Sequence, residues 1–464
     1  MFLIRETEKV KKMNNMNITP EYAAEEFKKL SGGIADVYTV DQGYNTKRGL
    51  RNDDGTGVLV GVTDIGSVMG YYMEDGERVP TEGKLYYRGI NVHEIIKEHR
   101  EKGTFGYEEV AFLLLFGKLP NAEEFEHFNS LLSKNRALPD SFTEDVLLRA
   151  PSRNIMNQLS RGIEALYSYD EIDDDTSPEN LLRQSIELIA RFPSIVANAY
   201  AVKRHRFYGK SLYIHNPKPG LSLSENFLRM VRPDKTYTDE EAKLLDIMLI
   251  LHAEHGGGNN SAFVCRAVSS SGTDTYSAIS AAVNSLKGPL HGGANAKVME
   301  MVSFIKRDLP DYADENKLRE YLSKLLDGTA GDRSGKIYGL GHAVYTISDP
   351  RAVSIRECAA SLAEKYGRLD ELRLLENIEK IGKELIMERK KMALPICANV
   401  DLYSGFVYDM LGIPEDLYTP LFAIARVTGW CAHRMEELIS CKRIMRPAYK
   451  AAIKKVPYTP MDER

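Results

Sequence analysis

The sequence predicts a mostly α-helical protein with a short β element near its N-terminus. From residue 107 onward, apolar residues recur at helical spacing in one segment after another. Only residues 58–88 place short β-rich runs between pairs of turn residues. Of the 464 residues, 43% are hydrophobic and 27% are charged, which are ordinary values for a globular chain and exclude a disordered or collagen-like one.

The N-terminal part predicts one helix, a loop and small hairpins. Residues 19–31 form the expected helix, because Thr19-Pro20 is a typical start and Gly32-Gly33 a typical end. Residues 41–57 are polar and contain several glycines, as in a surface loop. The expected strands and turns are residues 58–62, 68–73 and 84–88, separated by Asp75-Gly76 and Glu82-Gly83.

The rest of the chain predicts helices of two kinds. Apolar residues at helical spacing occupy residues 107–116, 155–166, 244–251, 279–286, 298–305, 374–385 and 420–435. Residues 306–334 and 350–392 are more charged, whereas 276–287 and 420–435 are the most apolar. This contrast predicts a smaller helical unit of roughly residues 300–400 inserted into a larger core.

Charge and cysteine usage exclude several classes of partner. The formal charge of −5, without a long basic run, gives no footprint for nucleic acid or for a membrane surface. The five cysteines are scattered without CxxC spacing, so we expect reduced thiols and no metal. No window is apolar enough to span a bilayer, and Met1–Ile4 is too short for a signal peptide. These features predict a cytoplasmic protein.

Three histidines lie in glycine-rich settings, where the backbone can approach a ligand closely. They are His255 before Gly256-Gly257-Gly258, His291 before Gly292-Gly293, and His342 after Gly339-Leu340-Gly341. His291 also precedes an expected helix, whose N-terminal dipole favours a neutral imidazole that donates a hydrogen bond. Each histidine alone could simply cap a turn, but three together indicate a site.

Two familiar motifs fit this chain poorly. His252-Ala253-Glu254-His255 has its histidines three apart, not four as in HExxH, so a zinc hydrolase is a remote alternative. Gly339-Leu340-Gly341 lacks the third glycine of GxGxxG and follows no clear strand, which argues against a dinucleotide fold.

Isolated charges in apolar segments are further candidates. Asp401 follows an apolar run and precedes an expected helix, so it is either an N-cap or a general base whose pKa burial raises. Arg426 lies inside an apolar helix, where it needs an internal carboxylate or a substrate carboxylate. Arg351 and Arg446 lie beside prolines and are individually uninformative.

Five blocks in order resemble the signatures of citrate synthase: residues 251–259, 288–295, 339–351, 399–405 and 422–426. Residues 84–89 and 107–120 are also similar to that family, so the resemblance runs from about residue 17 to the C-terminus. It implies a helical two-domain homodimer that closes over its substrates. The large domain, which dimerises, would be residues 1–296 and 403–464, and the small mobile domain on the coenzyme A side would be 297–402.

The resemblance also implies roles for the candidate residues. It makes His291, His342 and Asp401 the catalytic residues that join acetyl-CoA to oxaloacetate, the condensation of the tricarboxylic acid cycle. Oxaloacetate would be held by a set that the family shares: His255, Asn259, His342, Arg351, Arg426 and, from the partner subunit, Arg446. No bound cofactor is implied, since the coenzyme A thioester is a co-substrate.

Departures from the family pattern affect the coenzyme A side. Thr346 stands where many relatives carry Lys or Arg near the coenzyme A phosphates, so contacts are assigned instead to Lys336, with Arg333 as an alternative, and to Gly339 and Gly341. Gly256 stands where relatives often carry Glu, directly after the substrate-binding histidine. Two alternatives to a Si-type citrate synthase stay open: a 2-methylcitrate synthase that uses propionyl-CoA, and a non-catalytic helical oligomer that binds dicarboxylates or coenzyme A.

Overall fold

The computed structural model describes residues 46–53, 56–75, 77–392, 394–449, 451 and 455–464. The helix expected at 19–31 lies outside these residues. The chain forms two compact units, residues 1–58 with 446–464 and residues 59–445. Every candidate site residue except Arg446 belongs to the second unit, which is described below.

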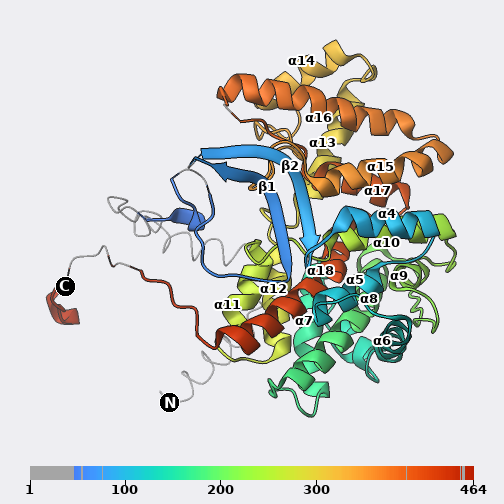
Figure 1. Ribbon diagram of the computed structural model, residues 1–464, viewed down its shortest axis with the longest axis vertical. Helices are drawn as coiled ribbons and strands as arrows, with labels where there is room; N and C mark the ends of the chain where they lie inside the picture. Colours follow the sequence, from blue (N-terminus) through green and yellow to red (C-terminus); the bar gives the residue numbers. More distant parts are fainter. Residues whose placement is uncertain (1–45, 54–55, 76, 393, 450, 452–454) are drawn as a thin grey trace, which may run out of the picture. The chain divides into compact units, whose positions relative to one another are not determined.

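A three-stranded antiparallel sheet forms the β element. Its strands are β1 (Gly66–Glu74), β2 (Glu77–Tyr87) and β3 (Ile90–Asn91), in the order β1-β2-β3. Of the turn expected at Asp75-Gly76, Asp75 lies in a turn between the paired residues Glu74 and Glu77, and Gly76 lies outside the described residues. Figure 1 shows β1 and β2 as a long hairpin.

Two expectations for this region were wrong. Residues 58–62 are not a strand, because their apolar side chains lack an apolar face to pack on: Leu59 is 85% exposed and Val62 84%. Glu82-Gly83 is not a turn but lies inside β2. Gly83 is needed there for close approach, because a Cβ would overlap the carbonyl oxygen of Ser348, whose hydroxyl accepts a hydrogen bond from the Gly83 N–H at 3.1 Å.

The remainder of the unit is helical, as predicted. The helices are α4 (Val92–Lys102), α5 (Tyr107–Phe116), α6 (Ala122–Asn135), α7 (Ile155–Leu166), α8 (Pro178–Tyr208), α9 (Leu223–Val231), α10 (Asp239–His252), α11 (Asn260–Ser269), α12 (Thr275–Leu286), α13 (Ala294–Asp308), α14 (Glu315–Leu326), α15 (Pro350–Lys365), α16 (Leu369–Lys390), α17 (Asp401–Met410) and α18 (Tyr418–Glu436). Each segment predicted from its apolar spacing falls within one of them. None of the described helices is both long and apolar enough to cross a membrane.

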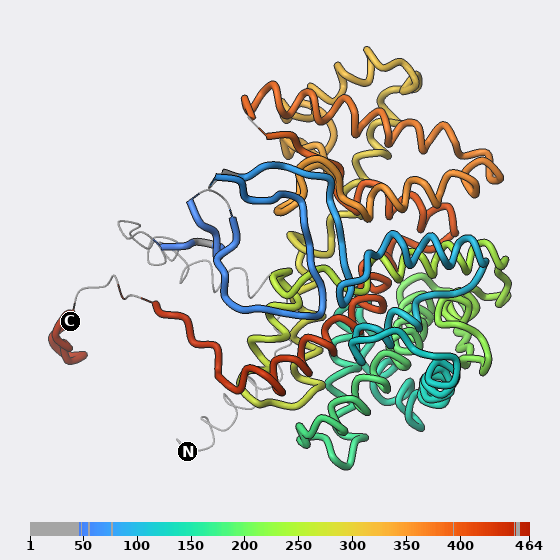
Figure 2. The backbone as a smooth tube through the Cα atoms, viewed as in Figure 1, coloured from blue at the N-terminus to red at the C-terminus, as the bar shows by residue number. Residues whose placement is uncertain are grey.

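The arrangement of the helices brings distant segments to one region. In Figures 1 and 2, α13 to α16 lie together at one end of the unit, coloured yellow to orange. Helix α18 packs against α8, α10 and α11, and α10 also contacts α15. The boundaries at residues 297 and 402 stay a prediction.

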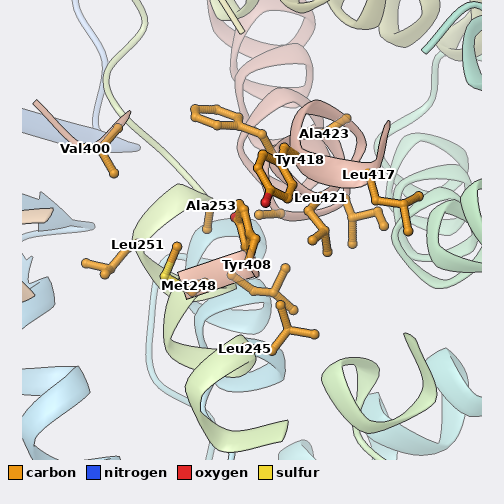
Figure 3. Close-up of a cluster of buried hydrophobic side chains, with 14 of the residues drawn as sticks. Leu245, Met248, Leu251, Ala253, Val400, Tyr408, Leu417, Tyr418, Leu421 and Ala423 are labelled. Atoms are coloured by element: carbon orange, nitrogen blue, oxygen red, sulfur yellow. The ribbon is translucent and has the colours of Figure 1, made fainter. Parts of the chain in front are cut away.

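An apolar cluster supports the C-terminal end of α10, where the site begins. Figure 3 shows Leu245, Met248 and Leu251 of α10 beside Tyr408 of α17 and Leu421 of α18. All five side chains are buried. Burial of such side chains stabilises the fold by about 1.5–3 kcal/mol each, so packing holds the end of α10 in place.

Candidate active site

The loop after α10 carries the first candidate, His255. Tyr87 of β2 ties this loop down, since its hydroxyl oxygen lies 2.8 Å from the carbonyl oxygen of Ile250 and 3.0 Å from that of Glu254. Gly256 follows with a φ of +78°, a conformation that favours glycine.

His255 lies among the other candidates. Its ring centroid is 5.3 Å from that of His342. Burial lowers the pKa of His255 well below its usual value, and the nearby charges of Arg351 and Arg426 add to this effect. The imidazole is therefore neutral, and its buried Nε2 has no hydrogen-bond partner among the described residues.

His291 is held by the start of α11. The backbone N–H of Ser261 donates to Nε2 of His291 at 3.3 Å, and the Ser261 hydroxyl lies 3.0 Å from the same atom. Because Nε2 accepts, the ring proton is on Nδ1. Burial, with the charge of Arg426, lowers the pKa of His291 to about 4. The expected neutral, donating imidazole is thus supported by its surroundings.

His342 has the opposite tautomer. Its Nδ1 accepts hydrogen bonds from the backbone N–H groups of Val344 at 3.0 Å and Tyr345 at 3.1 Å. The ring proton of the neutral imidazole is then on Nε2, which lies 3.5 Å from Nη2 of Arg351.

Arg351 lies in the first turn of α15 and is 4% exposed. Asp349, the N-cap of this helix, accepts from Nε of Arg351 at 3.0 Å and from Nη2 at 2.7 Å. Burial opposes the charge, but this bidentate pair raises the pKa of Arg351 above its usual value, so the guanidinium stays charged.

A short backbone pairing joins the loop that precedes Asp401 to the loop that precedes His342. The N–H of Gly341 donates to the carbonyl oxygen of Cys397 at 2.8 Å, and Asn399 Nδ2 donates to the carbonyl oxygen of Gly341 at 3.0 Å. Asn399 Oδ1 also accepts from the N–H of Asp401 at 3.0 Å. The two loops are thereby fixed side by side.

The carboxyl group of Asp401 has a raised pKa. Burial raises its pKa to about 6, against the charge of Arg351, which lowers it. A carboxylate with this pKa is ionised at neutral pH yet is a stronger base than a solvent-exposed one.

Arg426 is 1% exposed in the middle of α18. Its Nε donates to the carbonyl oxygen of His252 at 2.6 Å, and its Cζ lies 4.8 Å from the ring centroid of Phe422. Burial lowers the pKa of Arg426 to about 10. Its buried Nη2 has no hydrogen-bond partner among the described residues, and a ligand carboxylate would satisfy it.

In the second unit, His342 lies beside His255, and the charges of Arg351 and Arg426 link the other candidates to them. Arg351 lowers the pKa of both His255 and Asp401, and Arg426 lowers that of both His255 and His291. Two buried guanidinium groups and a carboxyl group of raised pKa are chemically able to bind an anion next to a base.

A comparison with known sequences decides the family. The family model described as "Citrate synthase, C-terminal domain" matches residues 54–448. This chain belongs to the citrate synthase family.

Individual citrate synthases agree with this assignment. That of Deinococcus radiodurans is 38% identical over 367 residues, which cover 79% of this chain and 89% of the relative. A 2-methylcitrate synthase of Shewanella oneidensis is 35% identical over 365 residues, which cover 78% of this chain and 87% of that protein. The ternary complex of Thermoplasma acidophilum citrate synthase with carboxymethyl coenzyme A and oxaloacetate has a TM-score of 0.74 at 26% identity, covering 90% of this chain and 100% of that one. The predicted fold and the prediction of an enzyme of the citrate synthase type are confirmed.

The remaining candidates of the citrate synthase pattern are placed less directly. Asn259 is the N-cap of α11, where its Oδ1 accepts from the N–H of Ala262 at 3.0 Å and its Nδ2 donates to the carbonyl oxygen of Gly256 at 2.5 Å. Lys336 is exposed, while Gly339 and Gly341 have φ values of +84° and +94° in the loop before His342. Arg446 is exposed and belongs to the first unit.

Sequence reasoning missed several residues that hold the site together. Ser261 and Asp349 orient His291 and Arg351, and Glu254 lies fully buried beside His255. The Asp-Pro-Arg sequence was an available signal for a helix cap next to Arg351, whereas nothing local marks Ser261. Among the described residues, no group of three or more His, Cys, Asp or Glu side chains is arranged to hold a metal ion.

Proposed function

We propose that this member of the citrate synthase family condenses acetyl-CoA with oxaloacetate and water to give citrate and coenzyme A. The observation that carries the proposal is the position of Arg351, which contacts His342 and acts on the pKa of Asp401. The guanidinium group of Arg351 therefore contacts His342, a hydrogen-bond donor suited to a ketone. The same group lowers the pKa of Asp401, a base suited to a thioester methyl group.

Oxaloacetate binding rests on the two buried arginines. Arg426 offers Nη2, and Arg351 offers the part of its guanidinium that Asp349 does not occupy. Positioning a dianion between them directs its keto oxygen to the Nε2–H of His342, which makes the keto carbon more electrophilic. His255, neutral at physiological pH, adds a further hydrogen-bonding group.

Enolisation of the thioester falls to Asp401 and His291. Asp401 removes a proton from the methyl carbon of acetyl-CoA, and the Nδ1–H of His291 donates to the thioester oxygen as negative charge develops there. The enol carbon attacks the keto carbon while His342 donates its Nε2 proton to the keto oxygen, and the proton that Asp401 took up returns to His342 before the next turnover, so that both groups are restored. Groups positioned in this way contribute typically ~10²–10⁴-fold each to the rate.

Hydrolysis of the citryl thioester completes the reaction. The thioester C–S bond breaks after water adds to the carbonyl carbon, and coenzyme A leaves as its thiol. This step requires that water reach the intermediate only after condensation, which the proposed mobility of residues 297–402 would provide. Lys336 and the loop glycines Gly339 and Gly341 are the proposed coenzyme A contacts.

The proposed assembly is a homodimer in which Arg446 of one subunit contacts oxaloacetate bound to the other. Its exposed guanidinium is compatible with this role. We expect Arg446→Ala to raise the oxaloacetate KM, and an unaffected KM would place the residue outside the site. A cytoplasmic location is also proposed.

Release of free thiol from acetyl-CoA in the presence of oxaloacetate tests the proposed activity. Folded protein that releases no thiol would favour a non-catalytic ligand-binding role. The similarity to a 2-methylcitrate synthase makes propionyl-CoA a second candidate substrate. One extra methylene in a pocket is worth only about 1–3 kcal/mol, so kcat/KM must be compared for both thioesters, and a tenfold preference for propionyl-CoA would replace the first proposal.

A further inference from the structure

The two buried arginines of the site are neutralised in different ways. Arg351 is bound by both carboxylate oxygens of Asp349, at 3.0 and 2.7 Å. Arg426 forms a hydrogen bond to the carbonyl oxygen of His252, but to no carboxylate among the described residues. Its position is nevertheless fixed, because the ring of Phe422 also covers its guanidinium.

Glu254 is the negative charge that faces Arg426. The residue is 0% exposed, and its charge raises the pKa of Arg426 against the lowering effect of burial. A methyl group at Gly429, one turn after Arg426 on α18, would overlap Oε2 of Glu254. The carboxylate therefore lies against the face of α18 that carries Arg426, with Oε2 lacking a hydrogen-bond partner among the described residues.

His433 holds this carboxylate in place. Its Nε2 lies 2.9 Å from Oε1 of Glu254, and its Nδ1 lies 2.8 Å from Nη1 of Arg266. Because a guanidinium can only donate, Nδ1 of His433 accepts and its ring proton points to Glu254. Arg266 is itself fixed by Glu436 at 2.6 Å. Burial raises the pKa of Glu254, but the interactions with His433 and Arg426 lower it below its usual value, so the carboxyl group is ionised.

We propose that Glu254 is a built-in counter-ion that balances Arg426 in the empty site and competes with the carboxylate of the substrate for this arginine. The inference deepens the proposed function and rests on it, since the competing ligand is oxaloacetate or the citrate product. Glu254 is a positioning residue that acts through Arg426. It keeps the buried guanidinium compatible with folding when no ligand is present, and it weakens the binding of both dianion and product so that product leaves.

The test is the Glu254→Gln variant, which retains an oxygen that can accept from His433 and loses the charge. We expect calorimetry to give oxaloacetate and citrate Kd values about 3–10-fold lower than in the wild-type protein, because ligand no longer competes with Glu254. The oxaloacetate KM should fall, and kcat should not rise. The Tm of the ligand-free variant should be lower than that of the wild-type protein. Adding oxaloacetate should raise the Tm of the variant by more than it raises the wild-type Tm. Weaker or unchanged binding by folded variant would overturn the inference.

Glu108→Gln is the matched control. Glu108 is another buried carboxylate beside an arginine, Arg136 at 3.7 Å, and it lies on α5, outside the proposed site. Its Kd for oxaloacetate should equal that of the wild-type protein. A wild-type protein that does not bind oxaloacetate at all would contradict the proposed function itself, which separates the two failures.

If Glu254→Gln does not fold, a second variant, His433→Leu, tests the same competition between Glu254 and the ligand for Arg426. The groups that face Glu254 are Tyr87, Arg88, Arg426 and His433, with Arg266 and Glu436 behind His433. Without the donor from His433, buried Glu254 should take up a proton as the pH falls. The ratio of the variant Kd to the wild-type Kd should therefore be smaller at pH 6 than at pH 8, and a ratio independent of pH would contradict the proposal.

Discussion

Nε2 of His342 lies 3.5 Å from Nη2 of Arg351. Because Nδ1 of His342 accepts from two backbone N–H groups, both of the facing atoms carry hydrogens. Two donors cannot bond to each other, but both can bond to neighbouring oxygens of one ligand. A keto group next to a carboxylate supplies such a pair of acceptors.

This relationship predicts the effect of replacing Arg351. Arg351→Gln should raise the oxaloacetate KM about 10–100-fold, because a hydrogen bond to a charged group is worth about 1.5–3 kcal/mol. The acyl-CoA KM should change much less. Arg356→Gln, on the same helix α15 but with a 37% exposed side chain, is the control and should leave both KM values unchanged. Equal oxaloacetate KM values for the two variants would remove Arg351 from the binding site.

The raised pKa of Asp401 predicts that the reaction rate depends on pH. The base must be ionised, and its pKa is about 6, so kcat should rise with pH through about 6 and level off above 7. Asp401→Ala should bind oxaloacetate normally but lose about 10²–10⁴-fold in kcat. Asp409→Ala, at the exposed end of the same helix, controls for damage to α17. An unchanged kcat in Asp401→Ala would exclude this residue as the base.

The helices could be predicted from the sequence because their signal is local. Apolar residues at spacings of three and four fall on one helix face, whatever the rest of the chain does. The prediction of a strand at residues 58–62 was wrong because a strand depends on contacts with other parts of the chain. A β-rich segment forms a strand only where its side chains can pack, and those of Leu59 and Val62 are exposed.

The site could be predicted only in part. Glycine-flanked histidines and isolated charges pointed to His255, His291, His342, Asp401 and Arg426. Their supporting contacts join residues 30 positions apart for Ser261 with His291 and 179 apart for Glu254 with His433. Arg351 is an instructive case, because a proline neighbour suggests a surface residue. Asp349, two positions earlier, instead caps α15 and binds the guanidinium, which allows both to be buried.

The two histidines should differ in the nitrogen that carries their proton. Nitrogen-15 NMR of the ligand-free protein should show Nδ1–H for His291 and Nε2–H for His342, since their other nitrogens accept from backbone N–H groups. The pKa of about 4 predicts that His291 stays neutral from pH 8 down to pH 5. A protonated imidazolium at pH 6 would be incompatible with its proposed role as a neutral donor to the thioester oxygen.

Gly429 should be unusually sensitive to a single methyl group. Alanine normally stabilises a helix by about 1 kcal/mol relative to glycine. Here the added Cβ would overlap both Oε2 of Glu254 and the carbonyl oxygen of Ala253, so Gly429→Ala should lower the free energy of unfolding by about 1–3 kcal/mol, as overpacking does. The displaced loop carries His255, so the oxaloacetate KM should rise as well. Gly61→Ala, where nothing lies within 4 Å of an added Cβ, is the control for thermal unfolding and kinetics. Wild-type stability in Gly429→Ala would mean that α18 does not approach the loop as closely as this packing requires.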